Sequence, residues 1–460
     1  MQMKDMLRGK LNGWINRGFY GIIFHRNRCC GGQDMRRRIA MAACVFLLSC
    51  GLILGGCGEK NKVVNYDDET GDIVDITFFG NKYEPENVAV IEEIISDFMK
   101  ENPDIRVSYE SLKGSEYFEA LEKRMAAEKG ADVFMVNHDV VLDLAADGKL
   151  ADLSGLKTIS GYTGLMLDQM DEDGKIYWVP TTVSVFGLYC NMDLLEENGQ
   201  KVPDNLNEWV QVLDYFKGKG MTPVIANNDI SLKTLAIGRG FYEVYQEGRE
   251  NEVFESLNAE EESLSTYLSS GFSLAEEFVR KGYIDAQAAL HTEKTSDDLE
   301  QFVKGESPFM LTGAWAAGRV KMMEPNLSFQ VVPYPLLDDG PLVVINADTR
   351  LSVNADSEHV EEAERFVEYF TGADNIQKFA DQQASFSPLK EGSPSSVEEI
   401  RPLIPCYQSG RTVLGADGKL DMPIWKLTAQ ASVGLLSGEP LDAVMDWMDT
   451  QAGQEGSTQE

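Results

Sequence analysis

The sequence has little basic charge and little histidine. It contains 460 residues, with 41 lysines and arginines against 75 aspartates and glutamates, which gives a formal charge of −34. Nucleic-acid phosphates would repel so acidic a chain, so we exclude nucleic acid as a partner. The four histidines are scattered and none has the spacing of metal ligands, and we therefore expect no metal and no cofactor.

Motifs of the common enzyme classes are also absent. The sequence has no G-x-S-x-G nucleophile elbow and no Walker loop, because Lys217-Gly218-Lys219-Gly220 lacks both the length and the Ser/Thr. Pairs of carboxylates arise by chance in a chain with 75 acidic residues, so they do not by themselves indicate a glycoside hydrolase. We predict no catalytic residues and no enzymatic activity.

Cysteine is scarce in the main part of the chain, where only Cys190 and Cys406 follow Cys57. A disulfide between them could form in an oxidising compartment, but two isolated cysteines are as often buried thiols. We favour free thiols and keep the disulfide as the alternative.

Long hydrophobic runs are limited to one, Ile39–Leu54, which follows three arginines at 36–38. At about 16 residues it is short for a membrane-spanning helix, which needs roughly 20. A basic segment, an apolar segment and small residues are typical of a secretory signal. The residues Leu54-Gly55-Gly56-Cys57 resemble the lipobox of bacterial lipoproteins, in which the cysteine thiol takes a diacylglycerol. We predict a signal peptide at 35–56 and a lipid anchor on Cys57; a cut before Cys50 and an uncleaved signal anchor are the alternatives.

The segments around this signal show no pattern of a folded domain. Residues 1–34 precede a better start at Met35, and we interpret them as an extension from a mis-assigned start codon, with a long natural leader as the alternative. Residues 57–72 are polar and predict a flexible tether. Residues 451–460 predict a frayed tail.

From residue 73 on, apolar strand patterns alternate with amphipathic helical patterns, which predicts a parallel α/β sheet. The strand patterns cover residues 73–80, 105–109 and 132–136. Ligands of open α/β sheets bind outside the carboxyl ends of the strands. Asn81, Lys82 and Asp139 directly follow two of these strands, so we expect them to contact a ligand.

Several segments between Ile73 and Trp447 occur in a specific order. They read ITFFG, KENPDIRV, ADVFMVNHD, DGKIYWVPTTVSVFGLYCNMDLLEENG, FVKGESPFMLTGAWA, VVPYPLL and AERFVEYFTG. With these segments the chain resembles the extracellular solute-binding proteins of ATP-binding-cassette importers, a family that includes the maltodextrin and other sugar receptors. The resemblance covers nearly all of the chain beyond the tether.

The resemblance implies a periplasmic-binding-protein-like fold, in which two α/β lobes are joined by a multi-strand hinge and the ligand cleft lies between them. The chain beyond the tether is also too long for one core, which favours two lobes. The chain should cross between the lobes near residues 182–187, near 332–336 and shortly after Phe370. The expected first lobe comprises 73–184 and 336–372, and the second comprises 185–335 and 373–450.

The resemblance also implies which residues line the cleft. Sugar-binding members place polar groups after the first strand, an acid after the third, a polar residue on the crossing strand, and aromatic rings against the faces of the sugar. The matching positions are Asn81, Lys82, Asp139, Ser184, Asn227, Trp315 and Trp425. The sequence departs from the family in two places: it has Tyr189-Cys190-Asn191 where many relatives have tyrosine followed directly by asparagine, and Val136 replaces an aromatic residue. Fewer stacking partners favour a shorter or less planar ligand.

The implied function is that of a monomeric receptor, lipid-anchored at the extracellular face of a bacterial membrane. It would capture a small solute, with a carbohydrate favoured, and deliver it to a permease. A secreted glycoside hydrolase is one alternative, and it would need two cleft carboxylates at a fixed separation. A sensor or adhesion lipoprotein that uses the same clamp is the other.

We predict that Trp315→Ala weakens ligand binding severely, because the ring would be lost from the cleft, and leaves the melting temperature of the ligand-free protein little changed. Calorimetric titration and thermal melts measure the two effects. Unchanged affinity would remove Trp315 from the site.

Overall fold

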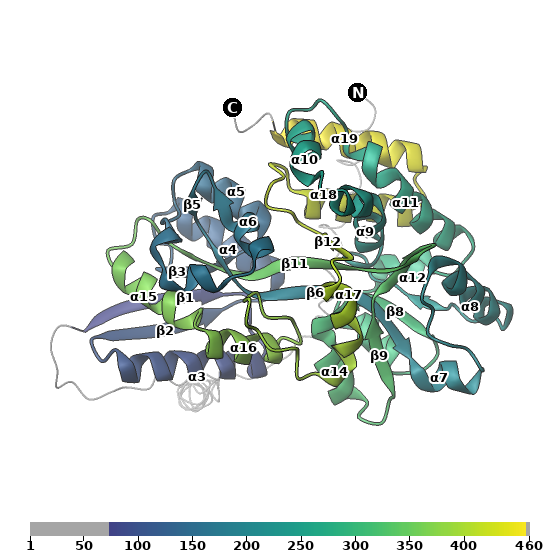
Figure 1. Cartoon of the computed structure of the whole chain (residues 1–460), viewed down its shortest axis with the longest axis horizontal. Helices are drawn as coiled ribbons and strands as arrows, with labels where there is room; N and C mark the ends of the chain where they lie inside the picture. Colours follow the sequence, from purple (N-terminus) through teal and green to yellow (C-terminus); the bar gives the residue numbers. More distant parts are fainter. Residues whose placement is uncertain (1–72, 457–460) are drawn as a thin grey trace, which may run out of the picture. The chain divides into compact units, whose positions relative to one another are not determined.

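The computed structural model describes residues 73–456, which form an α/β fold built around one mixed sheet (Figure 1). The strands lie in the order β2-β1-β3-β11-β6-β8-β7. β1 pairs in parallel with β2 and β3, as predicted, whereas β11 is antiparallel to both β3 and β6. The strands on this path are β1 (Val74–Gly80), β2 (Ile105–Ser111), β3 (Val133–Val136), β6 (Val179–Asn191), β7 (Val224–Ile225), β8 (Phe309–Gly313) and β11 (Gly340–Val353).

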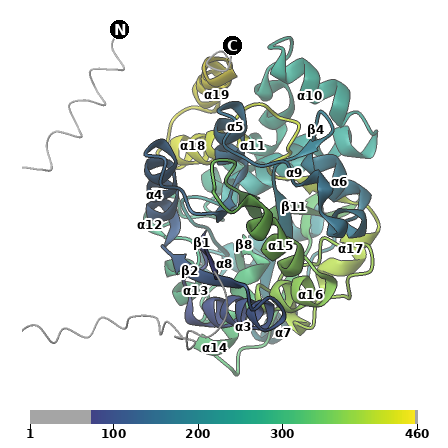
Figure 2. The same cartoon turned by 90° about the vertical axis from the view of Figure 1, so that its left-hand side faces the viewer.

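The first lobe surrounds β1, β2 and β3. Its helices are α3 (Pro85–Glu101), α4 (Gly114–Ala126), α5 (His138–Ala146), α6 (Gly164–Met170), α15 (Val360–Phe370) and α16 (Ala373–Gln382). In α3, Pro85 stands at the start, where a missing backbone N–H costs nothing, and Ile91, Ile94 and Phe98 are buried on one face. Figure 2 faces this lobe, with α3 and α16 below and α5 above. The predicted alternation of strands and helices is confirmed here.

The second lobe has its own hydrophobic core, centred on α9 and α11 and covered by α18 and α19. Its helices are α7 (Met192–Glu197), α8 (Leu206–Gly218), α9 (Ser231–Gln246), α10 (Glu250–Asn258), α11 (Leu264–Arg280), α12 (Ala286–His291), α13 (Asp297–Phe302), α14 (Ala317–Met323), α17 (Ile404–Gln408), α18 (Ile424–Leu436) and α19 (Leu441–Gly456). Its remaining strands are β9 (Phe329–Val332), β10 (Tyr334–Leu337) and β12 (Thr412–Leu414).

The two lobes share β6 and β11, which pair from Val344 opposite Phe186 to Leu351 opposite Val179. One end of β11 pairs with β3, and the other pairs with β10 and β12. The crossing predicted near 182–187 therefore lies on β6. The crossing predicted near 332–336 is wrong, because β9 pairs with the second-lobe end of β6 and the chain returns only along β11.

Two further boundaries differ from the expected ones. We placed the final return to the second lobe at residue 372, but α16 packs against α3 and so stays with the first lobe. We expected a frayed tail from residue 451, but α19 continues to Gly456 and buries Ala452 in the second core. The predicted extension, signal peptide, lipid anchor at Cys57 and tether lie outside the described residues.

Within residues 73–456, no helix is both long and apolar enough to cross a membrane. Cys190 and Cys406 are buried free thiols, in agreement with the favoured interpretation.

Helices α9 and α11 come into backbone contact at Gly271. A Cβ atom built there would lie 2.3 Å from the carbonyl oxygen and 2.5 Å from the Cα of Ala236. Overpacking of this kind forces backbone shifts, so we predict that Gly271→Ala lowers the free energy of unfolding by about 2 kcal/mol or more in urea denaturation. Gly218→Ala, in α8, is the matched control. Its Cβ meets nothing within 4 Å, so it should leave stability unchanged or raise it slightly. Equal stability of both variants would contradict the close approach.

Candidate functional site

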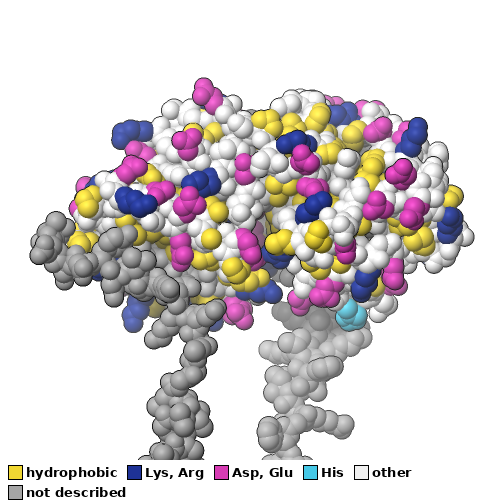
Figure 3. Space-filling model, turned by 90° about the horizontal axis from the view of Figure 1, so that it is seen from below, with side chains coloured by type: hydrophobic (Ala, Val, Ile, Leu, Met, Phe, Trp, Pro, Cys, Tyr) yellow, Lys and Arg dark blue, Asp and Glu magenta, His cyan; other side chains and the backbone are white. Residues whose placement is uncertain are grey.

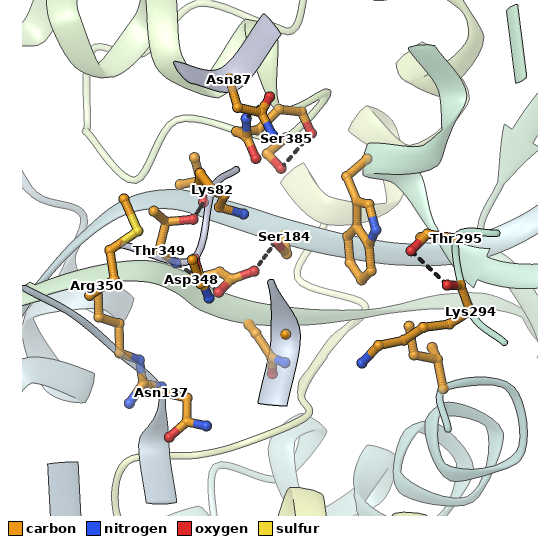
Figure 4. A pocket seen from close by; sticks show the side chains of 18 of the residues that line it. Lys82, Asn87, Asn137, Ser184, Lys294, Thr295, Asp348, Thr349, Arg350 and Ser385 are labelled. Carbon is orange, nitrogen blue, oxygen red and sulfur yellow. Dashed lines mark hydrogen bonds between the residues drawn. The ribbon is translucent and has the colours of Figure 1, made fainter. Parts of the chain in front are cut away.

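A cavity of about 440 Å³ lies between the lobes, against the hinge strands (Figure 4). The first lobe contributes the loops after β1 and β3, where polar side chains were predicted to meet a ligand. The hinge contributes Ser184 and Phe186 from β6 and residues 346–350 from β11. The second lobe contributes charged and aromatic side chains from several segments. Figure 4 shows Lys82, Ser184 and Asp348 grouped at the hinge, with Lys294 on the other side.

The structure brings most of the predicted site residues to this one cavity. Its wall includes Asn81, Lys82, Asp139, Ser184, Trp315 and Trp425. Their contact with a ligand stays a prediction. Within the described part of the chain, Asn81 Oδ1 and Arg350 Nη1 are buried atoms of wall residues without a hydrogen-bond partner. Buried polar groups are rarely left unbonded, so these two are available to a ligand or to water.

Asn227 is the exception, because it does not line the cavity. Its Oδ1 accepts hydrogen bonds from the backbone N–H of Ile230 at 2.8 Å and of Asp229 at 3.2 Å, and its Nδ2 donates to Asp298 at 3.0 Å. These bonds shape the turn after β7 and use both ends of the amide. Asn227 therefore positions Asp229, which does line the cavity, in place of the direct contact we expected.

Asp348, on β11, is a partly buried carboxylate that the sequence analysis missed. Ser184 donates a hydrogen bond to Asp348 Oδ2 at 2.5 Å, and the backbone N–H of Thr349 donates to Oδ1 at 2.7 Å. Burial raises the pKa of Asp348, but the charge of Lys82 and these two hydrogen bonds outweigh it and hold the pKa below its usual value. Asp348 therefore stays ionised and presents a strong acceptor at the hinge.

Thr349 carries backbone strain beside this carboxylate. Its φ is +45°, a left-handed value that a β-branched residue rarely adopts. The pairing of β11 with β6 continues in register on both sides of it, and its carbonyl accepts a hydrogen bond from Thr181 Oγ1 at 2.9 Å. Strain of this kind persists where surrounding contacts fix it, and it occurs here in the cavity wall.

Two tryptophans flank Phe186 on the second-lobe side. The ring centroids of Trp315 and Trp425 each lie 5.2 Å from that of Phe186, at interplanar angles of 84° and 48°. Each tryptophan also covers a glycine: a Cβ would meet the Trp315 ring at 2.1 Å if built on Gly313, and the Trp425 ring at 2.6 Å if built on Gly415. Only glycine leaves room for the rings in these positions, and the Gly-Ala-Trp segment at 313–315 was the sequence signal for the first.

Asp229 is the second ionised carboxylate of the wall. Its Oδ1 pairs with Lys233 at 2.5 Å, and its Oδ2 pairs with Lys294. Burial raises the pKa of Asp229, but the two lysine charges and their hydrogen bonds outweigh it and hold the pKa far below its usual range. The carboxylate is thus fixed in place and charged.

An ion pair joins the lobes at the edge of the cavity. Glu84, at the start of α3, pairs with Arg319 of α14. Arg319 also donates to the carbonyl of Thr295 at 2.8 Å, while Asn87 donates to the other carboxylate oxygen of Glu84 at 2.9 Å. The pair therefore has support on both sides.

The family model described as "Bacterial extracellular solute-binding protein" matches residues 93–399. The chain belongs to this family. Among curated relatives of this solute-binding protein, the multiple sugar-binding protein of Streptococcus mutans is 26% identical over 379 residues, which cover 79% of this chain and 84% of the relative. The melibiose/raffinose/stachyose-binding protein of Bacillus subtilis is 22% identical over 353 residues, 73% of this chain and 78% of the relative.

Solved structures agree with this membership at the level of the fold. The apo form of RafE from Streptococcus pneumoniae matches with a TM-score of 0.67 at 22% identity and covers 85% of this chain and 100% of its own. A sugar transporter of Bacillus licheniformis, in complex with stachyose, matches with a TM-score of 0.62 at 21% identity, covering 83% and 100%. The solute-binding protein therefore has the predicted two-lobed fold.

His138 joins the lobes of this solute-binding protein on another side of the cavity. Its Nε2 lies 3.0 Å from the carbonyl oxygen of Leu420, and its side chain is buried. Burial, together with the charge of Arg350, lowers the pKa of His138 to about 3. The imidazole is therefore neutral and donates a hydrogen bond to the second lobe at ordinary pH.

This pKa predicts a loss of stability in weak acid. Below about pH 6.5 the unfolded chain binds a proton at residue 138 that the folded protein does not bind, so the free energy of unfolding falls as the pH drops. At one pKa unit per 1.36 kcal/mol, His138 should account for up to about 2 kcal/mol between pH 7 and pH 5. The free energy of unfolding, measured by urea denaturation across this pH range, should lose this part of its pH dependence in His138→Gln. The control His291→Gln, at an exposed histidine, should keep it. The same pH dependence in wild type and His138→Gln would contradict the neutral buried histidine.

Proposed function

We propose that this chain is the lipid-anchored receptor of an importer and that it captures a neutral saccharide between its lobes. The observation that carries the proposal is the pairing, in one cavity, of two tryptophan rings with two ionised carboxylates. A sugar presents apolar C–H faces to aromatic rings and hydroxyl donors to carboxylates, so it needs both kinds of group. Relatives named for binding sugars support the choice of ligand class.

The charges of the wall favour a neutral ligand. Lys294 is paired with Asp229, and Arg319 is paired with Glu84. The positive charge of Lys82 interacts with the carboxylate of Asp348 and lowers its pKa. An anionic solute would have to compete with these carboxylates for the cations. The outer surface also shows acidic and basic side chains interspersed on the face seen in Figure 3.

Asp229 and Asp348 give no support to the hydrolase alternative. A glycoside hydrolase needs one carboxyl group kept protonated to donate to the leaving oxygen. Asp229 and Asp348 both have lowered pKa values, so neither can serve as that acid at neutral pH. Delivery to a permease, and anchoring through Cys57 at the outer face of the membrane, are part of the proposal. The family supports the first, and the resemblance of residues 54–57 to a lipobox supports the second.

A thermal-shift screen tests this function. The purified protein is melted with mono- and oligosaccharides, and with amino acids, polyamines and phosphate esters as controls, and the sugars are assayed for breakdown. A saccharide at roughly 100 times its Kd should add about 2.7 kcal/mol to the free energy of unfolding and raise the melting temperature.

A shift from one saccharide class without breakdown is the expected result. A shift from a control class alone would overturn the saccharide but keep the receptor, and consumption of the sugar would favour the enzyme.

A further inference from the structure

Lys233 is a buried cation just behind the cavity wall. It stands on α9, its side chain is 1% exposed, and it does not itself line the cavity. Its Nζ lies 2.5 Å from Asp229 Oδ1, 3.9 Å from the centroid of the Trp425 ring and 3.5 Å from the Trp425 carbonyl oxygen. One ammonium group therefore contacts both an ionised acid and an aromatic ring of the wall.

These two wall residues come from segments far apart in the chain. Asp229 lies in the turn before α9, and Trp425 lies at the start of α18. A cation over an indole ring is attracted to the ring electrostatically, more strongly when both are shielded from water. The same ammonium draws the carboxylate by an ion pair at i,i+4 spacing. Lys233 thus fixes the distance between an acceptor and a stacking surface.

We infer that Lys233 is a positioning residue for solute binding, which holds Asp229 and Trp425 in one arrangement without touching the solute. The inference rests on the proposed function, since it assumes that these two residues contact the saccharide. Burying a lysine is costly unless it is fully paired, and replacing a buried ion pair by apolar residues is often neutral or stabilising. A role in holding the binding surface explains why a cation stands here.

The same residue makes binding depend on pH. Burial lowers the pKa of Lys233 to about 8, and the charge of Asp229 opposes this fall. The other charged groups that act on it are Lys294, which lowers its pKa, and Asp139 of α5, which raises it. Lys233 is already buried, whereas the Asp229 side chain is 28% exposed, so a bound solute would remove water from Asp229 alone. This would strengthen the attraction between Asp229 and Lys233, so the protonated form binds more tightly. Above about pH 8 the cation is lost, and affinity should fall.

The test measures the Kd of the full protein for the saccharide found by the thermal-shift screen, by calorimetry between pH 6.5 and pH 9. We expect the wild-type Kd to rise about fivefold over this range, as it would if the pKa of Lys233 were about one unit higher in the bound protein than in the free protein. Lys233→Met should already bind about tenfold more weakly at pH 7 and should lose the pH dependence. Lys233→Arg, which keeps the charge, should recover part of the affinity at pH 7 and show no step near pH 8.

Lys281→Met is the matched control. Lys281 also forms an i,i+4 ion pair, with Glu277 at 2.8 Å, and lies 5.5 Å from the ring centroid of Tyr283, but away from the cavity. It should leave Kd and the pH profile unchanged. A wild-type affinity that is flat from pH 6.5 to 9, or a Lys233→Met variant that binds like wild type with the same profile, would overturn the inference.

A second measurement needs no ligand, so it separates failure of this inference from failure of the proposed function. The tryptophan emission of Trp425 is obtained as the difference between the wild type and Trp425→Phe, in the ligand-free protein, across the same pH range. We expect a transition near pH 8 that is absent when the same difference is taken in the Lys233→Met background. If this transition is seen and no saccharide binds, the contact between Lys233 and Trp425 stands and the saccharide is wrong. If the transition is absent from the wild type, the positioning role is wrong whatever the protein binds.

Discussion

The antiparallel pairing of β6 with β11 is the interaction on which the rest of the structure depends. These two strands belong to both lobes, so their ladder of hydrogen bonds sets where each lobe stands relative to the cavity. The ladder also places Ser184 opposite Asn346 and Thr182 opposite Asp348 at the cavity wall. A shift of one residue would turn every side chain of this region to the other face of the sheet. The register of one strand pair therefore determines the chemistry of the site.

Around this ladder, the cavity is built from charges that neutralise one another. The two ionised carboxylates of the wall are held by cations or by hydrogen bonds. Asp229 is paired with two lysines, and Asp348 accepts hydrogen bonds from Ser184 and from the backbone N–H of Thr349. Such groups cost little to desolvate further, because their partners already replace water. A polar and uncharged solute can then form hydrogen bonds with these groups, because the wall has no excess charge that the solute would have to neutralise.

The parallel part of the sheet and the loops after β1 and β3 could be predicted from local periodicity. The two lobes, and Ser184, Trp315 and Trp425 in the wall, were predicted only from the resemblance to a known family. The βα alternation gave the parallel sheet, and the loops after β1 and β3 were found from the rule for carboxyl strand ends. Asn227 also follows a strand, but its side-chain oxygen accepts hydrogen bonds from the backbone of its own turn, which the sequence does not reveal. Asp348, Arg350 and Lys233 were missed because they lie inside a strand or a helix, where their role depends on partners distant in the chain. The crossing near Pro335 was wrong because an extended, proline-containing segment can as well belong to one lobe as join two.

The strength of the ion pair between Glu84 and Arg319 bears on how long a solute stays in the cavity. Both side chains are partly exposed, at 21% and 32%, so the pair contributes on the order of 1 kcal/mol or less. Breaking a contact of that size changes an equilibrium only about fivefold, and salt in the surrounding medium weakens it further. The ion pair between Glu84 and Arg319 at the edge of the cavity is therefore too weak to retain a solute by itself. The time for which a solute stays bound then depends on the solute's own contacts, so a poorly fitting molecule leaves quickly and a well-fitting one stays longer.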